Sequence, residues 1–472
     1  MNEKRPNLIF VFADQWRRQA VGFMNEDPVV TPNMDKFADE SLIFENAIST
    51  FPLCSPHRAS LMTGRYPLST GMFTNCKPGV DVALGTHEIC ISDVLKKQGY
   101  ATGYIGKWHL DSSERNFSEN PESGAKGWDA YTPPGPKRHG FDFWYSYGAN
   151  DEHMAPHYWQ DSNKAIHINQ WSPEHETDVA IKYINDHTKK YEKNPFALFI
   201  SWNPPHSPYH MLPEKYKELY KDKDISFRPN VKAEGLYTHT YEKIGEGFET
   251  LTRFTKDYYA AVSGLDENFG RLLKVLKEQG IEDDTIVVLS SDHGDMMGSH
   301  GLMAKHVWLE ESIGIPFVIR WPSRILPGRE KTLLGSADVM PTLLQLMNIP
   351  VPASVEGTDL SPVIRKEKTQ PVTSAFICAC PGRDVFLKEL SAKGIDPKTL
   401  GWRGVRTYRY TYVVSKGYFP GEKTKRLLYD NETDPYQLNP LCFETAAEND
   451  LAFQMELELK EWLSKLDDPF SI

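Results

Sequence analysis

The sequence has 472 residues and a net charge of −11, from 53 Lys and Arg against 64 Asp and Glu. This length suits one large α/β unit with a smaller unit beside it, and the composition is typical of a soluble protein. The negative charge without a basic block argues against a nucleic-acid partner, and no apolar run approaches the roughly 20 residues of a membrane span.

The first predicted strand begins almost at the N-terminus. Residues 7–13 are a continuous apolar run, which is typical of a strand covered on both faces. The residues before it leave no room for a signal peptide. We therefore expect a soluble protein that is either cytoplasmic or, if an export segment is missing from this sequence, periplasmic or secreted. Residues 31–44 have apolar side chains at helical spacing, with Pro32 at the first helical position.

The next stretch, residues 54–65, reads CSPHRASLMTGR. Pro56 favours a helix start and predicts that the thiol of Cys54 lies just ahead of that helix. The positive end of the helix dipole and the Arg58 cation would both favour an anionic or polarised group at position 54. The alternative is a small buried cysteine beside a surface arginine.

The remaining chain alternates helices and strands up to about residue 360. In chain order, we expect helices at 88–98, 174–191, 253–279 and 338–347, and strands at 101–106, 196–202, 285–289 and 315–321. Residues 111–170 form a long insert rich in Gly, Pro, His and aromatic residues, and such inserts are usually binding loops or flexible loops. Beyond residue 370, two segments resemble strands with no helix between them, at 402–415 and 426–430, and 449–465 resembles a final helix.

This order of elements predicts an α/β protein with a large, mainly parallel sheet between layers of helices. The change in character near residue 370 predicts a second, smaller antiparallel α+β subdomain. We place the boundary between residues 1–365 and residues 366–472.

Four predicted strands end in polar residues. The clusters are Asp14-Gln15, Lys107 with His109, His206, and Asp292-His293. Because ligands of such sheets bind outside the carboxyl ends of the strands, we expect one shared site. Two carboxylates, an amide oxygen and an imidazole nitrogen suit Ca²⁺ or Mg²⁺, while Mn²⁺ and Zn²⁺ stay open. The alternative for Asp14 alone is a helix N-cap.

Cys54, Pro56, Arg58, Thr63 and Gly64 together resemble the signature of the type I sulfatases, members of the alkaline phosphatase superfamily. In that family a separate maturing enzyme oxidises the cysteine to formylglycine. Segments 336–344, 356–360 and 428–436 also resemble sulfatase sequences. The resemblance implies an alkaline phosphatase-like fold, with residues 1–365 as the catalytic domain.

The resemblance also implies a metal site. Asp14, Gln15, Asp292 and His293 would bind one divalent ion together with the modified Cys54. Ca²⁺ is the expected ion, and Mg²⁺ and Mn²⁺ are the alternatives. Gln15 and His293 replace a commoner Asp and Asn, as in choline sulfatases and phosphonate monoester hydrolases.

The catalytic roles implied by the resemblance fall on five further residues. Arg58 and Lys107 would hold the hydrated formylglycine, and His109 would take a proton from it. His206 would protonate the leaving oxygen, and Lys305 would bind a sulfate oxygen. Taken as single residues, a packed histidine at position 206 and a solvated lysine at position 305 would be the favoured interpretations. Asp295, His300 and His306 receive no role.

The expected reaction is hydrolysis of a sulfate ester on a sulfated mono- or oligosaccharide. Candidate sugar contacts are His153, His157, Tyr158 and Trp159, which could instead pack the insert. Segments 111–170 and 215–250 do not match the family, so we expect them to select the substrate. The alternatives are a choline-sulfatase-like enzyme, a phosphonate monoester or phosphodiester hydrolase, and an inactive protein that binds anionic sugars.

Overall fold

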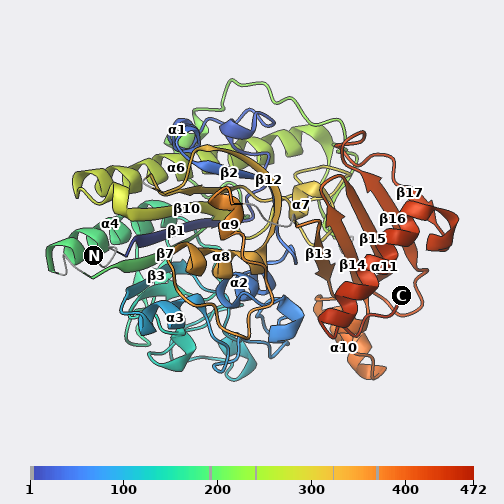
Figure 1. Cartoon of the computed structure of the whole chain (residues 1–472), viewed down its shortest axis with the longest axis horizontal. Helices are drawn as coiled ribbons and strands as arrows, with labels where there is room; N and C mark the ends of the chain where they lie inside the picture. The colour runs from blue at the N-terminus through green and yellow to red at the C-terminus, as the bar shows by residue number, and fades with distance from the viewer. Residues whose placement is uncertain (1–4, 191–193, 240–241, 323, 368–371) are drawn as a thin grey trace.

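The computed structural model describes residues 5–190, 194–239, 242–322, 324–367 and 372–472. Its main sheet has eight strands in the order β12-β2-β11-β10-β1-β7-β3-β4 (Figure 1). Only β11 among these runs antiparallel to its neighbours. The strands are β1 (Asn7–Asp14), β2 (Leu42–Ile48), β3 (Ala101–Lys107), β4 (Phe143–Tyr147), β7 (Phe196–Pro205), β10 (Thr285–Ser291), β11 (Phe317–Arg320) and β12 (Gly328–Gly335).

Helices cover both faces of this sheet because its central strands are apolar on both sides. In β1, Ile9 and Val11 belong to one core and Leu8 and Phe10 to the other. The first core contains residues of α1 (Pro32–Asp39), α4 (Ser172–Lys190) and α6 (Gly247–Glu278). The second contains residues of α2 (Cys54–Thr63), α3 (Ile91–Lys97), α8 (Val339–Leu346) and α9 (Ser361–Ile364).

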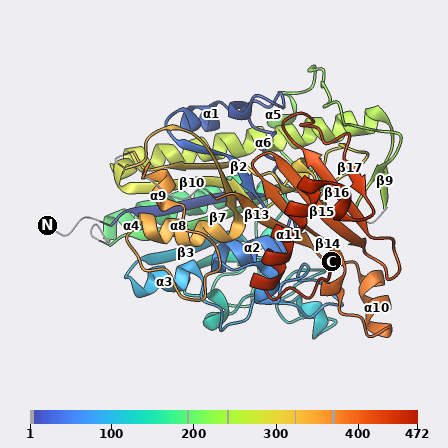
Figure 2. The ribbon, with the colours of Figure 1, turned by 45° about the vertical axis from the view of Figure 1, so that its right-hand side comes forward.

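A second, antiparallel sheet of five strands lies beside the first (Figure 2). Its strands are β13 (Ser374–Ala379), β14 (Gly401–Thr407), β15 (Tyr410–Gly417), β16 (Lys425–Asp430) and β17 (Leu441–Phe443). Helix α11 (Asp450–Lys465) packs on this sheet through Ala452, Met455 and Leu459, and α10 (Asp384–Ala392) connects β13 to β14.

The second sheet also supports the segment that leads into α2. Phe51 and Leu53 belong to the core of this sheet, and the backbone N–H of Cys378 donates to the carbonyl of Thr50 over 2.9 Å. The C-terminal residues therefore help to fix the backbone just before Cys54. The predicted boundary after residue 365 falls between the two sheets and stays a prediction.

The shorter elements lie in the connections. They are β5 (His157–Tyr158), β6 (Ile166–His167), β8 (Leu236–Tyr237), β9 (Lys243–Gly245), α5 (Glu214–Lys217) and α7 (Glu310–Ile313). Within the described residues, none of the helices is both long enough and apolar enough to cross a membrane. All six cysteines are free.

The predicted α/β class, the mainly parallel sheet and the separate antiparallel sheet are confirmed. Three local predictions were wrong. The helix expected over 31–44 ends at Asp39, because residues 42–44 pair with β11 and β12. The segment 402–415 is two strands joined by a turn, and the insert contributes the edge strand β4. The expected end of α4 at Tyr191 lies outside the described residues.

Gly106 allows β3 to approach β7 closely, just before the predicted site residue Lys107. Its φ is +95°, and a Cβ there would lie 2.1 Å from the carbonyl oxygen of Ser201. Gly99 has a similar φ of +84° but no atom within 4 Å of a built Cβ. We expect Gly106→Ala to destabilise the fold by about 3 kcal/mol or more, and Gly99→Ala by about 1–2 kcal/mol from φ alone. Melting temperatures measure the difference, and equal losses would contradict the close approach.

Candidate active site

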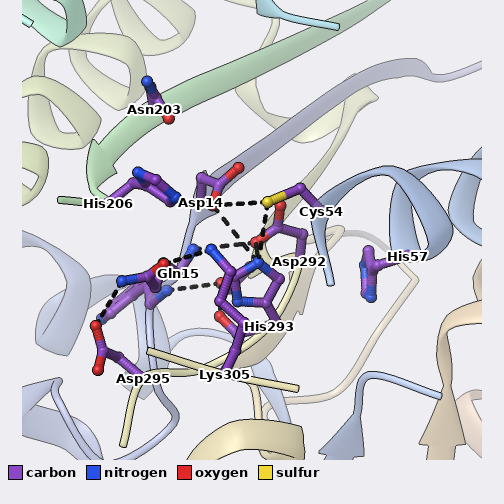
Figure 3. A network of polar contacts seen from close by, with 12 residues as sticks. Asp14, Gln15, Cys54, His57, Asn203, His206, Asp292, His293, Asp295 and Lys305 are labelled. Carbon is purple, nitrogen blue, oxygen red and sulfur yellow. Dashed lines mark hydrogen bonds and ion pairs between the residues drawn. The ribbon is translucent and has the colours of Figure 1, made fainter. Parts of the chain in front are cut away.

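The signature cysteine meets the ends of two adjacent strands. Asp14 ends β1, Asp292 and His293 follow β10, and these strands pair side by side up to Ala13 and Ser291. Cys54 is the first residue of α2 rather than the residue before it. Its Sγ lies 3.3 Å from Nε2 of His293 and 3.6 Å from Oδ1 of Asp14 (Figure 3).

These four side chains form a donor set that fits a divalent cation. Their donor atoms all lie within 4.8 Å of one another, and each residue is at most 1% exposed. Burial and the neighbouring Asp14 carboxylate raise the pKa of Asp292 to about 6. Two carboxylates enclosed this closely are stabilised by a cation between them, and their oxygens suit a hard ion.

Gln15 lies beside this group in a left-handed backbone conformation, with φ of 65°. Its backbone N–H donates to Oδ1 of Asp292 over 3.0 Å. Its side-chain oxygen accepts a hydrogen bond from Nζ of Lys305, and its amide nitrogen donates to Asp295 over 2.6 Å. Gln15 therefore connects the carboxylates to Lys305, and its role as a metal ligand stays a prediction.

Two buried cations contact the Asp14 carboxylate. One terminal nitrogen of Arg58 lies 3.0 Å from Asp14 and 3.1 Å from Asp292, and Nζ of Lys107 lies 2.7 Å from Asp14. Burial opposes ionisation of Asp14, but Lys107, His206 and Arg58 hold its pKa well below the ordinary value. Arg58 also donates to the carbonyl of Lys107 and to Ser201, both over 2.7 Å, so its guanidinium is fixed.

The same charges act on the Cys54 thiol. Burial and Asp14 would raise its pKa, but Lys305, Lys107 and His293 together lower it well below the ordinary value. The position thus favours a negatively charged group, as the helix start and Arg58 predicted from the sequence.

His109 is arranged as a proton acceptor. Its Nε2 lies 3.0 Å from the carbonyl oxygen of Cys76, which makes Nε2 the protonated nitrogen. Its Nδ1 is buried and has no hydrogen-bond partner among the described residues. Burial and the charge of Lys107 lower the pKa of His109, and its interaction with the Cys54 side chain partly opposes them. A neutral imidazole with a free, unprotonated nitrogen is suited to general-base chemistry.

His206 is arranged as a proton donor. Burial and Lys305 would lower its pKa, but Asp151 and Asp14 outweigh them and raise it to about 9. Nδ1 of His206 lies 3.3 Å from Oδ1 of Asp151. Asn203 links the two sides of the site, because it accepts from Lys107 over 3.0 Å and donates to Asp151 over 3.0 Å.

A family model described as Sulfatase matches residues 6–349, which include all of these side chains. The chain belongs to the sulfatase family. A second model, described as N-sulphoglucosamine sulphohydrolase, C-terminal, matches residues 298–465.

The sulfatase has relatives that match it along nearly its whole length. It is 37% identical over 496 residues to an endo-4-O-sulfatase of Bacteroides thetaiotaomicron, with 99% of this chain and 93% of the relative covered. It is 33% identical over 473 residues to an ulvan-active sulfatase of Formosa agariphila, with 99% and 82% covered. A solved structure of a sulfatase, yidJ, from Bacteroides fragilis superposes with a TM-score of 0.86 at 37% identity, covering 100% of this chain and 98% of that one. The protein is a sulfuric ester hydrolase.

The structure of the sulfatase brings most of the predicted site residues together. Lys305 lies on the loop after β10, and its Nζ contacts the group by donating to the side-chain oxygen of Gln15. Sequence reasoning missed Asn203 and Asp151, and it left Asp295 without a role. Asn203 lies near the end of β7, three positions before His206, so its position was a usable signal. Asp151 lies in the insert, where the sequence pattern offered no sign of its contact with His206.

The predicted sugar contacts in the sulfatase are largely packing residues. Tyr158 is fully buried and Trp159 is 1% exposed, and both belong to the core beneath the insert. The Tyr158 hydroxyl donates to Glu176 over 2.9 Å. Nε2 of His157 lies 2.8 Å from Oδ2 of Asp129. The burial of Tyr158 and Trp159 favours the alternative that they pack the insert, and their contact with a sugar stays a prediction. His153 lies nearer the site, with Nε2 3.0 Å from the carbonyl oxygen of His206.

The contact between Asp151 and His206 predicts a change in the pH profile of the sulfatase. If protonated His206 is the acid, activity falls as pH rises through about 9. Asp151→Asn removes a charge that raises this pKa, so the alkaline limb of kcat should move toward neutral pH. The matched control is Glu152→Gln at the next exposed position. An unchanged alkaline limb in Asp151→Asn would contradict this assignment of the acid.

Proposed function

We propose that the enzyme hydrolyses sulfate esters of a sulfated carbohydrate, with formylglycine made from Cys54 as its nucleophile. The observation that supports this proposal most is the position of Cys54 in the structure. It lies at the start of α2, against Asp14 and His293, among the cations Arg58, Lys107 and Lys305. Relatives named as an ulvan-active sulfatase and an N-acetylglucosamine-6-O-sulfatase support a carbohydrate substrate.

Asp14, Gln15, Asp292 and His293 would hold one divalent ion. Oxygen donors predominate in this set, so Ca²⁺ is the ion that we propose, with Mg²⁺ and Mn²⁺ as alternatives. When bound, the ion supplies positive charge that favours ionisation of the nearby hydroxyl group and offsets charge on the sulfate group.

The first chemical step forms one S–O bond and breaks another. The aldehyde of formylglycine adds water to give a hydrate, which Arg58 and Lys107 orient. One hydroxyl group of the hydrate loses its proton to solvent and attacks sulfur as an oxyanion, and the bond between sulfur and the sugar oxygen breaks. His206 donates its proton to that departing oxygen, so the sugar leaves as an alcohol. Lys305 stabilises the charge on a sulfate oxygen.

The second step releases sulfate and restores the aldehyde. Nδ1 of His109 takes the proton of the remaining hydroxyl on residue 54. The electron pair of that O–H bond forms the C=O bond, and the bond between carbon and the sulfate oxygen breaks. Addition of water regenerates the hydrate. His109 then passes its proton to solvent, and His206 is reprotonated.

Cys54 is only 1% exposed in the folded chain. A maturing enzyme would therefore have to oxidise it before the fold closes, so the test requires co-expression with such an enzyme. We expect the co-expressed protein to release sulfate from at least one member of a panel of sulfated mono- and disaccharides.

An aryl phosphonate monoester is the comparison substrate. The residue types at positions 15 and 293 resemble those of phosphonate monoester hydrolases. The charged Lys107 favours a sulfate ester as the substrate. Faster turnover of the phosphonate than of every sulfate ester would reject the proposed reaction.

A further inference from the structure

Trp128 differs from the other large aromatic side chains of the insert 111–170, all of which the structure describes. Of the large hydrophobic side chains exposed there, only Phe117 and Trp128 are aromatic, at 70% and 45% exposure. Trp144, Tyr158 and Trp159 are at most 1% exposed. Phe117 and Trp128 are therefore the most exposed Phe, Tyr or Trp side chains of this insert.

Trp128 lies against the site, whereas Phe117 makes no ring contact with any other described residue. The ring centroids of Trp128 and His109 are 6.1 Å apart, with an angle of 40° between the ring planes. Nζ of Lys77 lies 5.7 Å from the centre of the Trp128 ring. Lys77 directly follows Cys76, the residue whose carbonyl oxygen bonds His109. The exposed indole thus adjoins the group that we assign as the proton acceptor.

The backbone at Trp128 is held by the next residue. Oδ1 of Asp129, which is fully buried, accepts from the backbone N–H groups of Gly148 over 2.7 Å and Ala149 over 3.1 Å. Its other oxygen contacts Nε2 of His157 over 2.8 Å. Lys77 is in turn paired with Asp384 on α10, in the C-terminal part of the chain. The backbone beside Trp128 and the ammonium group over its ring are thus both held in place, and a preordered side chain loses little freedom when a ligand binds.

We propose that Trp128 is a specificity-determining residue on which a pyranose ring of the substrate stacks. A pyranose ring presents C–H groups on its faces, and the face of an indole is electronegative and apolar. The partly open ring beside His109 would hold the sugar while its sulfate group enters the cluster of cations. This inference rests on the proposed function, and it gives to Trp128 the role that the sequence suggested for Tyr158 and Trp159.

Binding to protein that cannot turn over tests the inference. In a Cys54→Ala background, Trp128→Ala should weaken binding of a sulfated saccharide by about tenfold or more, measured by calorimetry. Inorganic sulfate, which has no sugar ring, should bind with unchanged affinity. Trp128→Phe should restore most of the saccharide affinity, and Phe117→Ala is the matched control with no expected effect. In mature enzyme, kcat/KM for the saccharide should follow the binding results.

Three results would overturn the inference. One is saccharide affinity of Trp128→Ala within about twofold of its parent. Another is an equal loss of affinity for saccharide and sulfate, which would show a disturbed cation cluster instead of a lost stacking surface. The third is the absence of any sulfated saccharide that wild-type enzyme binds or hydrolyses, which would reject the proposed function together with the inference. The first two results would leave the proposed function intact.

Discussion

Cys54→Ala is expected to lower kcat by about 10⁴- to 10⁶-fold, because it removes the atom that attacks sulfur and leaves only binding and charge stabilisation. The fold should persist, since the change removes only the small group beyond Cβ at the first residue of α2, whether that group is the thiol or its oxidised form. Sulfate release and the melting temperature, measured on the same preparations, separate loss of chemistry from loss of structure.

The matched control is Cys442→Ala, which removes the exposed thiol on β17. It should leave kcat unchanged. A Cys54→Ala protein with more than about a tenth of wild-type kcat would show that another group attacks the ester.

Removal of the divalent ion should have the second largest effect. Chelation followed by dialysis should abolish turnover, since the charge that favours ionisation of the nucleophile is lost. It should also lower the melting temperature. An ion present at 100 times its Kd contributes about 2.7 kcal/mol to stability, and without it Asp14 and Asp292 repel each other. Restoring Ca²⁺, Mg²⁺ or Mn²⁺ one at a time identifies the ion that supports activity.

Asp292→Asn tests the same site without a chelator. It should weaken metal binding and lower kcat/KM by at least about 100-fold. Asp222→Asn changes an exposed carboxylate on another loop and serves as its control. Full activity in a preparation with far less than one metal ion per chain would contradict a metal-dependent site.

The sequence could predict that these polar residues lie together, because the fold assembles them from strand ends. Asp14, Lys107, His206 and Asp292 each follow an apolar run, and parallel strands bring their carboxyl ends to one edge. The helix start at Cys54 was predicted within one residue, from Pro56 and the residues after it. These features are local in sequence, so no knowledge of tertiary contacts was needed.

The insert could not be predicted in this way. Strand β4 lies within it, and its residues Phe-Trp-Tyr-Ser-Tyr form a strand only because β3 offers a free edge. Tyr158 packs on Tyr145 of β4 and donates to Glu176 of α4, and the backbone of Trp159 pairs with Ser146 of β4. Composition does not reveal these contacts. The contact between Asp151 and His206 joins positions 55 residues apart, and no spacing rule indicates it.

The most direct test of the formylglycine mechanism is to measure the chemical state of residue 54 in active enzyme. Trypsin should release residues 37–58 as one peptide, since Lys36 and Arg58 flank a stretch without other Lys or Arg. We predict that its mass in active protein is that of formylglycine at position 54, that it reacts with an aldehyde probe, and that the modified fraction tracks kcat across preparations. Full activity from protein in which this peptide carries only an unmodified cysteine would contradict the formylglycine mechanism.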